Sequence, residues 1–451
     1  MRNAGRVCLA TLIELDSEAK GVLGFCDRRG GGPGSEPMLK LEDYEPIVGP
    51  EIIERILHKA RGLRDRSIVN VSSTYYGGGV AAKLTSLVLL MNSAGIRTGW
   101  RIIQGRQDFF GITKRMHNAL QGGLDVFTDE DKAIYEEVNE ENAIRNHLDH
   151  DFVVVHDPQP LPLVEHYRKR SPWVWRCHID LTHPHPQLWD YLRRFVQQFD
   201  AVIMSIPEYA QDIRPSQFFH MPAIDPFTEI NRYMSDEEVD RRLAQYGIPT
   251  DLPIIVQVSR FDKWKDPQGV IDAFRIARKE APCTLILKGN SATDDPEGAL
   301  IYNSILDQQD ERIILINNED VPVVNALQRK AAVVIQKSLR EGFGLTVTEA
   351  MWKGTPVIGG NVGGIRYQIT DGVSGFLVNN VQETADRIVT LLKNPDLRRK
   401  MGQAGHETVK KNFLMTRLVE EYLNLFNSFE ISIKIRGPMG VSTAVSVAQA
   451  G

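Results

Sequence analysis

The sequence is poor in cysteine, and the few cysteines it has are far apart. Four occur among 451 residues, with no CxxC pair: Cys8, Cys26, Cys177 and Cys283. Neither a disulfide framework nor a zinc site is therefore expected. A reducing environment fits this usage best, so we expect a cytoplasmic protein.

Other absences narrow the class of protein further. No run of about 18 apolar residues occurs, so we expect no membrane span and no membrane partner. The N-terminus lacks a basic segment followed by a clean apolar stretch, which argues against a signal peptide. The net charge is -5 at pH 7, and this lack of a basic excess argues against a nucleic-acid partner. A GxGxxG motif with an acidic residue about 20 positions later is also missing, which argues against a dinucleotide oxidoreductase.

What the chain does contain is an alternation of short apolar runs with amphipathic segments. The apolar runs, typical of strands, fall into two series: 67–73, 98–103, 152–156, 173–178 and 200–206, then 254–260, 284–289, 312–316, 332–337 and 356–360. Such runs separated by helices predict parallel sheets covered on both faces. Ten strands are too many for one comfortable sheet, and YGIPTDLP (246–253) is the natural break. We therefore predict an α/β protein with two Rossmann-like, doubly wound domains and a cleft between them.

The predicted division of the chain has five parts. An irregular tail (1–40) precedes an N-terminal domain (41–248) and a C-terminal domain (249–411). A helix with apolar residues at helical spacing follows (412–429), and a second irregular tail (430–451) ends the chain. From its pattern alone this helix could dock on either domain.

Polar residues follow several N-terminal strands, at the sheet edge where ligands of such folds bind. Three glycines (77–79) precede a helix, either as a tight turn or as backbone that approaches an anionic ligand. The next two clusters suit sugar hydroxyls; they contain Asp157, Gln159, Arg176, His178 and Asp180. A buried histidine and a local Arg–Asp pair would explain any one of them, but two such clusters at strand ends of one domain favour a site. Neighbouring histidines lack carboxylate partners, so we expect no metal.

The C-terminal strands are followed by cations and by glycines. Arg260 and Lys265, five positions apart across a turn, suit phosphate oxygens, the alternative being two solvated charges. The stretch EGFGLTVTEAMW (341–352) places glycines before a helix whose first N–H groups could bind an anion, unless it is simply a capped helix. Glu341 and Glu349 are eight positions apart, so in one helix they would share a face and accept hydrogen bonds from hydroxyls.

These motifs together resemble the retaining glycosyltransferases of the GT-B fold. Glu341 to Glu349 looks like their E-x7-E signature, Arg260 with Lys265 like their paired cations, and the glycines at 77–79 like their N-terminal glycine loop. Longer strings, among them STYYGGGV, HDPQP, WVWRCHIDL and REGFGLTVTEAMWKG, resemble the trehalose glycosyltransferring synthases over residues 41–428. The sequence departs from the family pattern in three places: Asp266-Pro267, Ala82-Lys83 and residues 359–361.

The resemblance implies a role for each candidate residue. The catalytic set would be Arg260, Lys265, Glu341 and His178. The donor-binding set would be Gly77, Gly78, Gly79, Gly342, Phe343, Gly344, Leu345, Thr346 and Glu349. The acceptor-binding set would be Asp157, Gln159, Arg176 and Asp180. The helix 412–429 would cross back to the N-terminal domain.

The activity implied is the reversible transfer of glucose, with retention, from a nucleoside-diphosphate glucose to free glucose, giving α,α-trehalose. The partners would be nucleotide sugar, glucose, trehalose and a second copy of the chain in a homodimer, with no cofactor and no essential metal. Two alternatives stay open: a retaining trehalose phosphorylase, and a catalytically silent sensor of sugar nucleotides.

Overall fold

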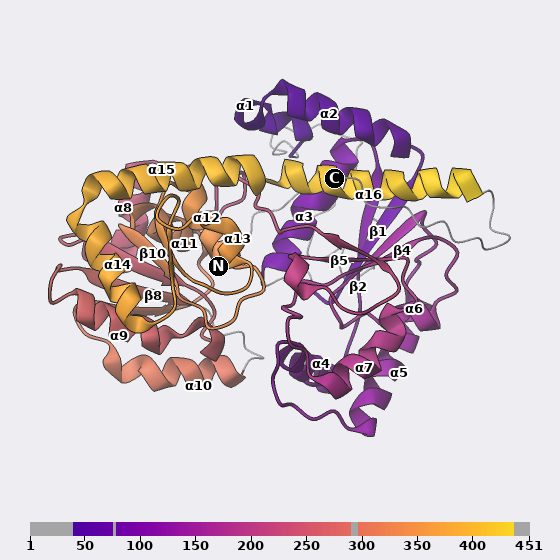
Figure 1. The fold of residues 1–451 in the computed structure, drawn as a ribbon, viewed down its shortest axis with the longest axis horizontal. Coiled ribbons are helices and arrows are strands. Elements are labelled where there is room, and N and C mark those ends of the chain that lie inside the picture. The colour runs from indigo at the N-terminus through magenta and orange to yellow at the C-terminus, as the bar shows by residue number, and fades with distance from the viewer. Residues whose placement is uncertain (1–38, 75–77, 290–295, 437–451) are drawn as a thin grey trace.

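The computed structural model describes residues 39–74, 78–289 and 296–436, which form two parallel sheets flanked by helices (Figure 1). The first sheet has six strands in the order β2-β1-β3-β4-β5-β6. They are β1 (Ser67–Ser72), β2 (Arg97–Ile102), β3 (Phe152–His156), β4 (Trp173–Arg176), β5 (Ala201–Met204) and β6 (Ser216–Phe219). Every neighbouring pair in it is parallel.

The second sheet repeats this architecture in the C-terminal half of the chain. Its six strands lie in the order β12-β11-β10-β7-β8-β9, again all parallel. They are β7 (Ile254–Val258), β8 (Thr284–Gly289), β9 (Ile313–Asn317), β10 (Val333–Gln336), β11 (Val357–Gly360) and β12 (Phe376–Val378). The predicted fold class, two doubly wound α/β units, is confirmed.

Helices connect the strands and cover both sheets. In the N-terminal half they are α1 (Glu45–Val48), α2 (Pro50–Ala60), α3 (Gly78–Ser93), α4 (Gln107–Leu120), α5 (Asp129–Arg145), α6 (Leu163–His166) and α7 (Pro186–Val196). The remainder are α8 (Asp236–Gln245), α9 (Pro267–Ala277), α10 (Pro296–Ile305), α11 (Val321–Lys330), α12 (Leu345–Trp352), α13 (Ile365–Gln368), α14 (Val381–Lys393), α15 (Pro395–Asn412) and α16 (Met415–Arg436). Among the described residues, no helix is both long and apolar enough to span a membrane.

Burial on both faces explains why the strands read as continuous apolar runs. Every residue of β3 and β8 is buried. On one side of the first sheet the core is filled from α4, α5 and α7, and on the other side from α2, α3 and α16. Two further clusters cover the second sheet in the same way.

Helix α16 belongs to the N-terminal half although it comes last in the described chain. It packs on α2 and α3, and in Figure 1 it runs along that half as the continuation of α15. Val419, Leu423 and Phe426 are buried in the core of that half. Glu420 is held by Arg55 at 2.6 Å and Lys59 at 2.7 Å. The helix ends at Arg436, seven residues beyond the end predicted at 429.

The chain passes between the halves twice, and the two passages are bonded to each other. The Ile224 N–H donates to the Phe413 carbonyl (2.8 Å), and the Met415 N–H donates to the Ile224 carbonyl (3.0 Å). After the first passage, α8 packs on α11, and its Val239 and Leu243 lie in the core under the second sheet. We therefore propose that the C-terminal domain begins before α8, and not at residue 249.

Candidate active site

The loops that follow the strands of the two halves meet at a cavity of ≈ 270 Å³. The N-terminal half lines it with Gln121, Asp180, Thr182, His183, Ile206 and Glu208. The C-terminal half lines it with Leu339, Arg340, Asn361, Val362, Gly363 and Arg366. Eight of the twelve lining residues carry polar side chains, and such groups could orient a small polyhydroxylated ligand.

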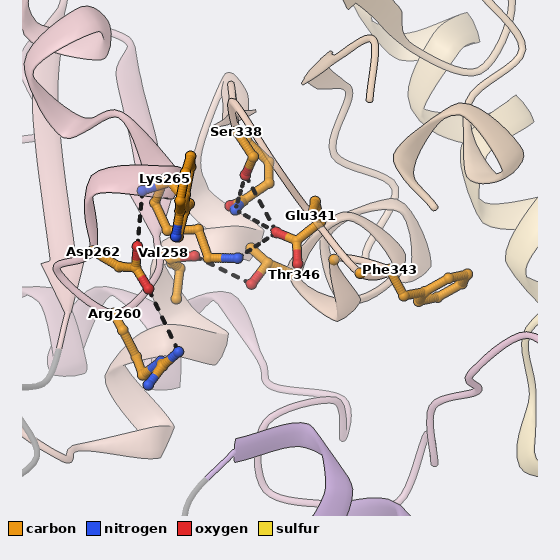
Figure 2. A network of polar contacts seen from close by, with 12 residues as sticks. Val258, Arg260, Asp262, Lys265, Ser338, Glu341, Phe343 and Thr346 are labelled. Carbon is orange, nitrogen blue, oxygen red and sulfur yellow. Dashed lines mark hydrogen bonds and ion pairs between the residues drawn. The ribbon is translucent and has the colours of Figure 1, made fainter. Parts of the chain in front are cut away.

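Glu341 and Lys265 form the centre of the polar network beside this cavity (Figure 2). The Glu341 carboxylate is buried, and its Oε2 accepts a hydrogen bond from Lys265 Nζ at 2.5 Å. Ser338 Oγ donates to the same oxygen at 3.2 Å and Gln336 Nε2 at 3.4 Å. One positive charge and two neutral donors therefore fix a single carboxylate at the carboxyl end of β10.

Arg260 approaches the same network from the loop after β7. Its guanidinium lies 3.6 Å from Asp262 Oδ2, and the side chain is 45% exposed, so a ligand can reach it. Helix α4 of the other half faces this region with His117. Burial first, then the charge of Arg260, lowers the pKa of His117 to about 3. The positive charges of Arg260 and Lys265 in the C-terminal half thus lie near a neutral histidine, His117, of the N-terminal half.

The loop that carries Glu341 is held between the two halves. Tyr209 of the N-terminal half donates its hydroxyl to the Gly342 carbonyl at 2.7 Å and lies 3.1 Å from the Glu341 carbonyl. A Cβ on Gly342 would lie 2.9 Å from the His178 carbonyl, so only glycine fits there. Gly344 has φ +85° and caps α12, whose first residue is Leu345.

Phe343 and Thr346, also in the proposed donor-binding set, make their side-chain contacts outside the Glu341 network. Phe343 points away from the network in Figure 2 and packs its buried ring on Phe413 at 5.8 Å. Thr346 Oγ1 donates to the Val258 carbonyl at 3.2 Å. The structure therefore gives the Phe343 side chain a packing role.

Glu349 does not share a helical face with Glu341, contrary to the spacing argument. Helix α12 begins only at Leu345, so Glu341 lies in the preceding loop. The Glu349 carboxylate lies 3.5 Å from Gln328 Nε2 of α11, and burial raises its pKa. The E-x7-E spacing thus reflects a loop followed by a helix.

In the N-terminal half, polar side chains form a chain behind the same loop. Lys83 Nζ lies 3.2 Å from His178 Nδ1, and His178 Nε2 lies 3.1 Å from His156 Nδ1. His156 Nε2 lies 3.0 Å from Asn70 Oδ1. Burial lowers the pKa of both histidines well below the usual value, so both are neutral.

Asp157 holds the backbone of His178, one member of this series of hydrogen-bonded side chains. Its Oδ1 accepts a hydrogen bond from the His178 N–H at 2.8 Å, and burial raises its pKa to about 6. Asp157 has φ +64°, a conformation that a non-glycine residue seldom adopts. Such strain is commonly found at functional sites.

The other residues of the proposed acceptor set differ in accessibility. Arg176 is wholly buried, and its guanidinium donates to the carbonyls of Met204 (3.0 Å) and His220 (2.6 Å). These contacts anchor strand ends, and the acceptor-binding role of Arg176 stays a prediction. Asp180 lines the cavity and accepts from Thr182 at 2.6 Å. Gln159 Oε1 is buried without a hydrogen-bond partner among the described residues.

One of the three sequence departures, at Asp266, finds a local explanation. Of the glycine loop, Gly77 lies outside the described residues, while Gly78 and Gly79 open α3. Asp266 has φ +50°, a conformation in which glycine is favoured. Its carboxylate compensates by capping α9 through the Gly269 N–H at 3.1 Å and by pairing with Lys337. Lys83, part of a second departure, was not among the predicted site residues, yet its Nζ contacts His178 Nδ1.

Models of known protein families match both halves of the chain. Residues 70–211 match the family model "Trehalose synthase, N-terminal domain", and residues 238–408 match "Glycosyl transferases group 1". The trehalose synthase of Pyrococcus horikoshii is 46% identical over 399 residues, which cover 86% of this chain and 96% of that protein. The trehalose synthase of Rubrobacter xylanophilus is 41% identical, with the same coverage of 86% and 96%. A trehalose phosphorylase of Pleurotus pulmonarius is 27% identical, covering 80% of this chain and 57% of that protein.

Solved structures share the fold. The UDP-forming α,α-trehalose-phosphate synthase of Burkholderia xenovorans superposes with a TM-score of 0.65 at 14% identity, covering 81% of this chain and 99% of that one. The sucrose-phosphate synthase of Thermosynechococcus elongatus gives 0.64 at 17% identity, covering 81% and 100%. The arrangement of two sheets described above is therefore the GT-B fold.

Proposed function

Since the chain belongs to the trehalose synthase family of glycosyltransferases, we propose that it joins glucose from a nucleoside-diphosphate glucose to free glucose, reversibly, forming α,α-trehalose. The observation that best supports this reaction is the Lys265–Glu341 pair, in a loop held between the two halves. A carboxylate there can accept from glucose hydroxyls. Lys265 donates one of its three N–H groups to Glu341, and the other two can donate to phosphate oxygens.

In the proposed step, the bond between the anomeric carbon and the diphosphate oxygen breaks as the acceptor hydroxyl attacks from the same face. The hydroxyl proton passes to the departing phosphate oxygen, and the anomeric configuration is retained. Arg260 and Lys265 stabilise the negative charge that develops on the diphosphate. Closure of the two halves around the substrates excludes water, which would otherwise hydrolyse the donor.

A nucleotide-release assay tests the activity and its alternatives. Purified protein receives ADP-glucose or UDP-glucose, with and without free glucose. We expect glucose-dependent release of nucleotide together with a non-reducing disaccharide. Glucose 1-phosphate formed from trehalose and inorganic phosphate would instead indicate a phosphorylase, and tight nucleotide-sugar binding without turnover would indicate a sensor.

The family resemblance also supports a homodimer, which light scattering of the purified protein tests.

Arg260→Ala should slow turnover without unfolding the protein. The lost charge removes about 2–4 kcal/mol of transition-state stabilisation, by analogy with a lost oxyanion donor, which corresponds to about 30- to 1,000-fold in kcat. Steady-state kinetics at saturating donor measure the effect. Arg399→Ala, which removes a 76% exposed arginine on α15, is the control and should leave kcat unchanged. Unchanged turnover in Arg260→Ala would remove Arg260 from the mechanism.

A further inference from the structure

Lys83 lies on α3 with its side chain partly buried, and its ammonium group has one hydrogen-bond partner among the described residues. Among the described residues, the hydrogen-bond partner of its Nζ is His178 Nδ1, at 3.2 Å. An ammonium carries three N–H donors, and buried donors in native proteins are almost always bonded. Two donors of Lys83 are therefore available to a ligand.

The direction of each hydrogen bond behind Lys83 can be worked out from Asn70. The Asn70 Nδ2 donates to the Gly99 carbonyl (3.3 Å), so its Oδ1 is the acceptor that faces His156 Nε2. His156 is neutral, so with its proton on Nε2 its Nδ1 must accept from His178 Nε2. His178 is neutral as well, which leaves its Nδ1 as the acceptor for Lys83.

This chain of bonds occupies both ring nitrogens of His178. Each ring nitrogen thus has a partner in this arrangement, and the catalytic role of His178 stays a prediction. The group at the open end of the chain is Lys83. Its position is fixed by three successive side chains that reach into the sheet at β1, β3 and the end of β4.

The open end lies where the two halves meet. The backbone of His178 packs on Gly342, the neighbour of Glu341, because a Cβ at Gly342 would lie 2.9 Å from the His178 carbonyl. The ionisable groups that face Lys83 are His178, Asp157 and Arg176. Burial, followed by the charge of Arg176 and opposed by Asp157, lowers the pKa of Lys83 to about 7.

We propose that Lys83 is a substrate-contacting residue whose ammonium, held by His178, His156 and Asn70, donates hydrogen bonds to hydroxyl oxygens of a substrate hexose. The proposal rests on the proposed function for the identity of the substrates. The diphosphate is assigned to Arg260 and Lys265 of the other half, so the oxygens left for Lys83 are those of the transferred or the accepting glucose. No proton transfer is assigned to it.

Lys83→Met tests the proposal, because methionine retains the length of the side chain and removes its charge. We expect kcat/KM to fall about 10- to 100-fold, the effect of a lost charged hydrogen bond. The affinity for ADP or UDP alone, measured by calorimetry, should stay within about twofold of the wild type. The hexose concerned is identified by whether KM rises for glucose or for the nucleotide sugar. Lys330→Met, which breaks a surface ion pair with Asp240, is the matched control and should not alter either value.

Three measurements separate this role from a structural one. The melting temperature of Lys83→Met should not fall, because an apolar chain replaces a partly buried charge. The wild-type kcat/KM should decline as pH rises through about 7, where the ammonium loses its proton, and Lys83→Arg should move that decline to higher pH. An unchanged kcat/KM in Lys83→Met, or an equal loss of nucleotide affinity, would overturn the proposal.

Calorimetry with glucose and trehalose keeps this test independent of turnover. If the wild type binds hexose but shows no glucose-dependent nucleotide release, the proposed function fails, and weaker hexose binding by Lys83→Met would still support Lys83. If hexose binding is the same in wild type and Lys83→Met, the role of Lys83 is overturned whatever the activity.

Discussion

Replacing Lys265 with alanine should reduce kcat by about 10³-fold or more, the largest effect that we expect from a single side chain. Lys265 has two tasks in the proposed mechanism: it neutralises the departing diphosphate, and its 2.5 Å contact holds the Glu341 carboxylate. Without it, the donors left to the Glu341 carboxylate among the described residues are the neutral side chains of Ser338 and Gln336. A buried carboxylate without its cation is strongly disfavoured, so the site should lose both charge and geometry.

Turnover at saturating donor and calorimetric binding of the nucleoside diphosphate measure the two tasks separately. Lys263→Ala is a close control, because Lys263 lies in the same 3₁₀ turn (Lys263–Lys265) but places its ammonium 5.1 Å from the Trp264 ring centre. It should change kcat by no more than about threefold, as a surface substitution does. Similar losses in the two variants would show that the charge of the turn matters and the contact with Glu341 does not.

Gly363→Ala should be the most damaging substitution that adds a single carbon atom. Gly363 has φ +45°, and a Cβ there would lie 1.7 Å from the Glu341 carbonyl and 3.1 Å from the Tyr209 hydroxyl. Backbone strain and overpacking together should cost about 2–5 kcal/mol of folding stability. Since the displaced atom belongs to the loop of Glu341, activity should fall further than stability alone explains.

Gly372→Ala separates the two contributions to this loss. Gly372 also has a positive φ, +73°, but a Cβ there would meet nothing within 4 Å. Its alanine variant should lose only the strain energy, about 1–2 kcal/mol, and keep full kcat. Thermal unfolding and kinetics of both variants test this, and equal losses of activity would show that the Gly363 contact has no special role.

Much of the architecture could be predicted because apolar runs are a local signal. All ten predicted strands occur in the structure, but β6 and β12 were missed. Both are short strands at a sheet edge, and every residue of β6 is at least partly exposed, so its sequence carries no continuous apolar run. The boundary that we propose before α8 is not visible in the sequence, because the turn at 246–253 is a strong local signal while the packing of α8 on α11 is not local.

The candidate site was predictable in its residue types but not in its contacts. Spacing could bring Glu341 and Lys265 to one sheet edge, but their pairing depends on how two loops fold over strands that are neighbours only in space. Arg176 shows the same limit: nothing in RCHID indicates that its guanidinium turns inward to the carbonyls of Met204 and His220. Lys83 stands out in the sequence only as a departure, because the side chains linked to it, His178, His156 and Asn70, come from separate parts of the chain.

The paired passages at Ile224 and Leu414 also bear on how the chain is made. Everything between them is one uninterrupted segment whose ends meet, so the C-terminal half is complete once α15 has been synthesised. The N-terminal half emerges from the ribosome before the C-terminal half, yet part of its core comes from α16, which is translated after both. The half that is synthesised first must therefore wait for its final helix, with the apolar faces of α2 and α3 exposed until α16 arrives.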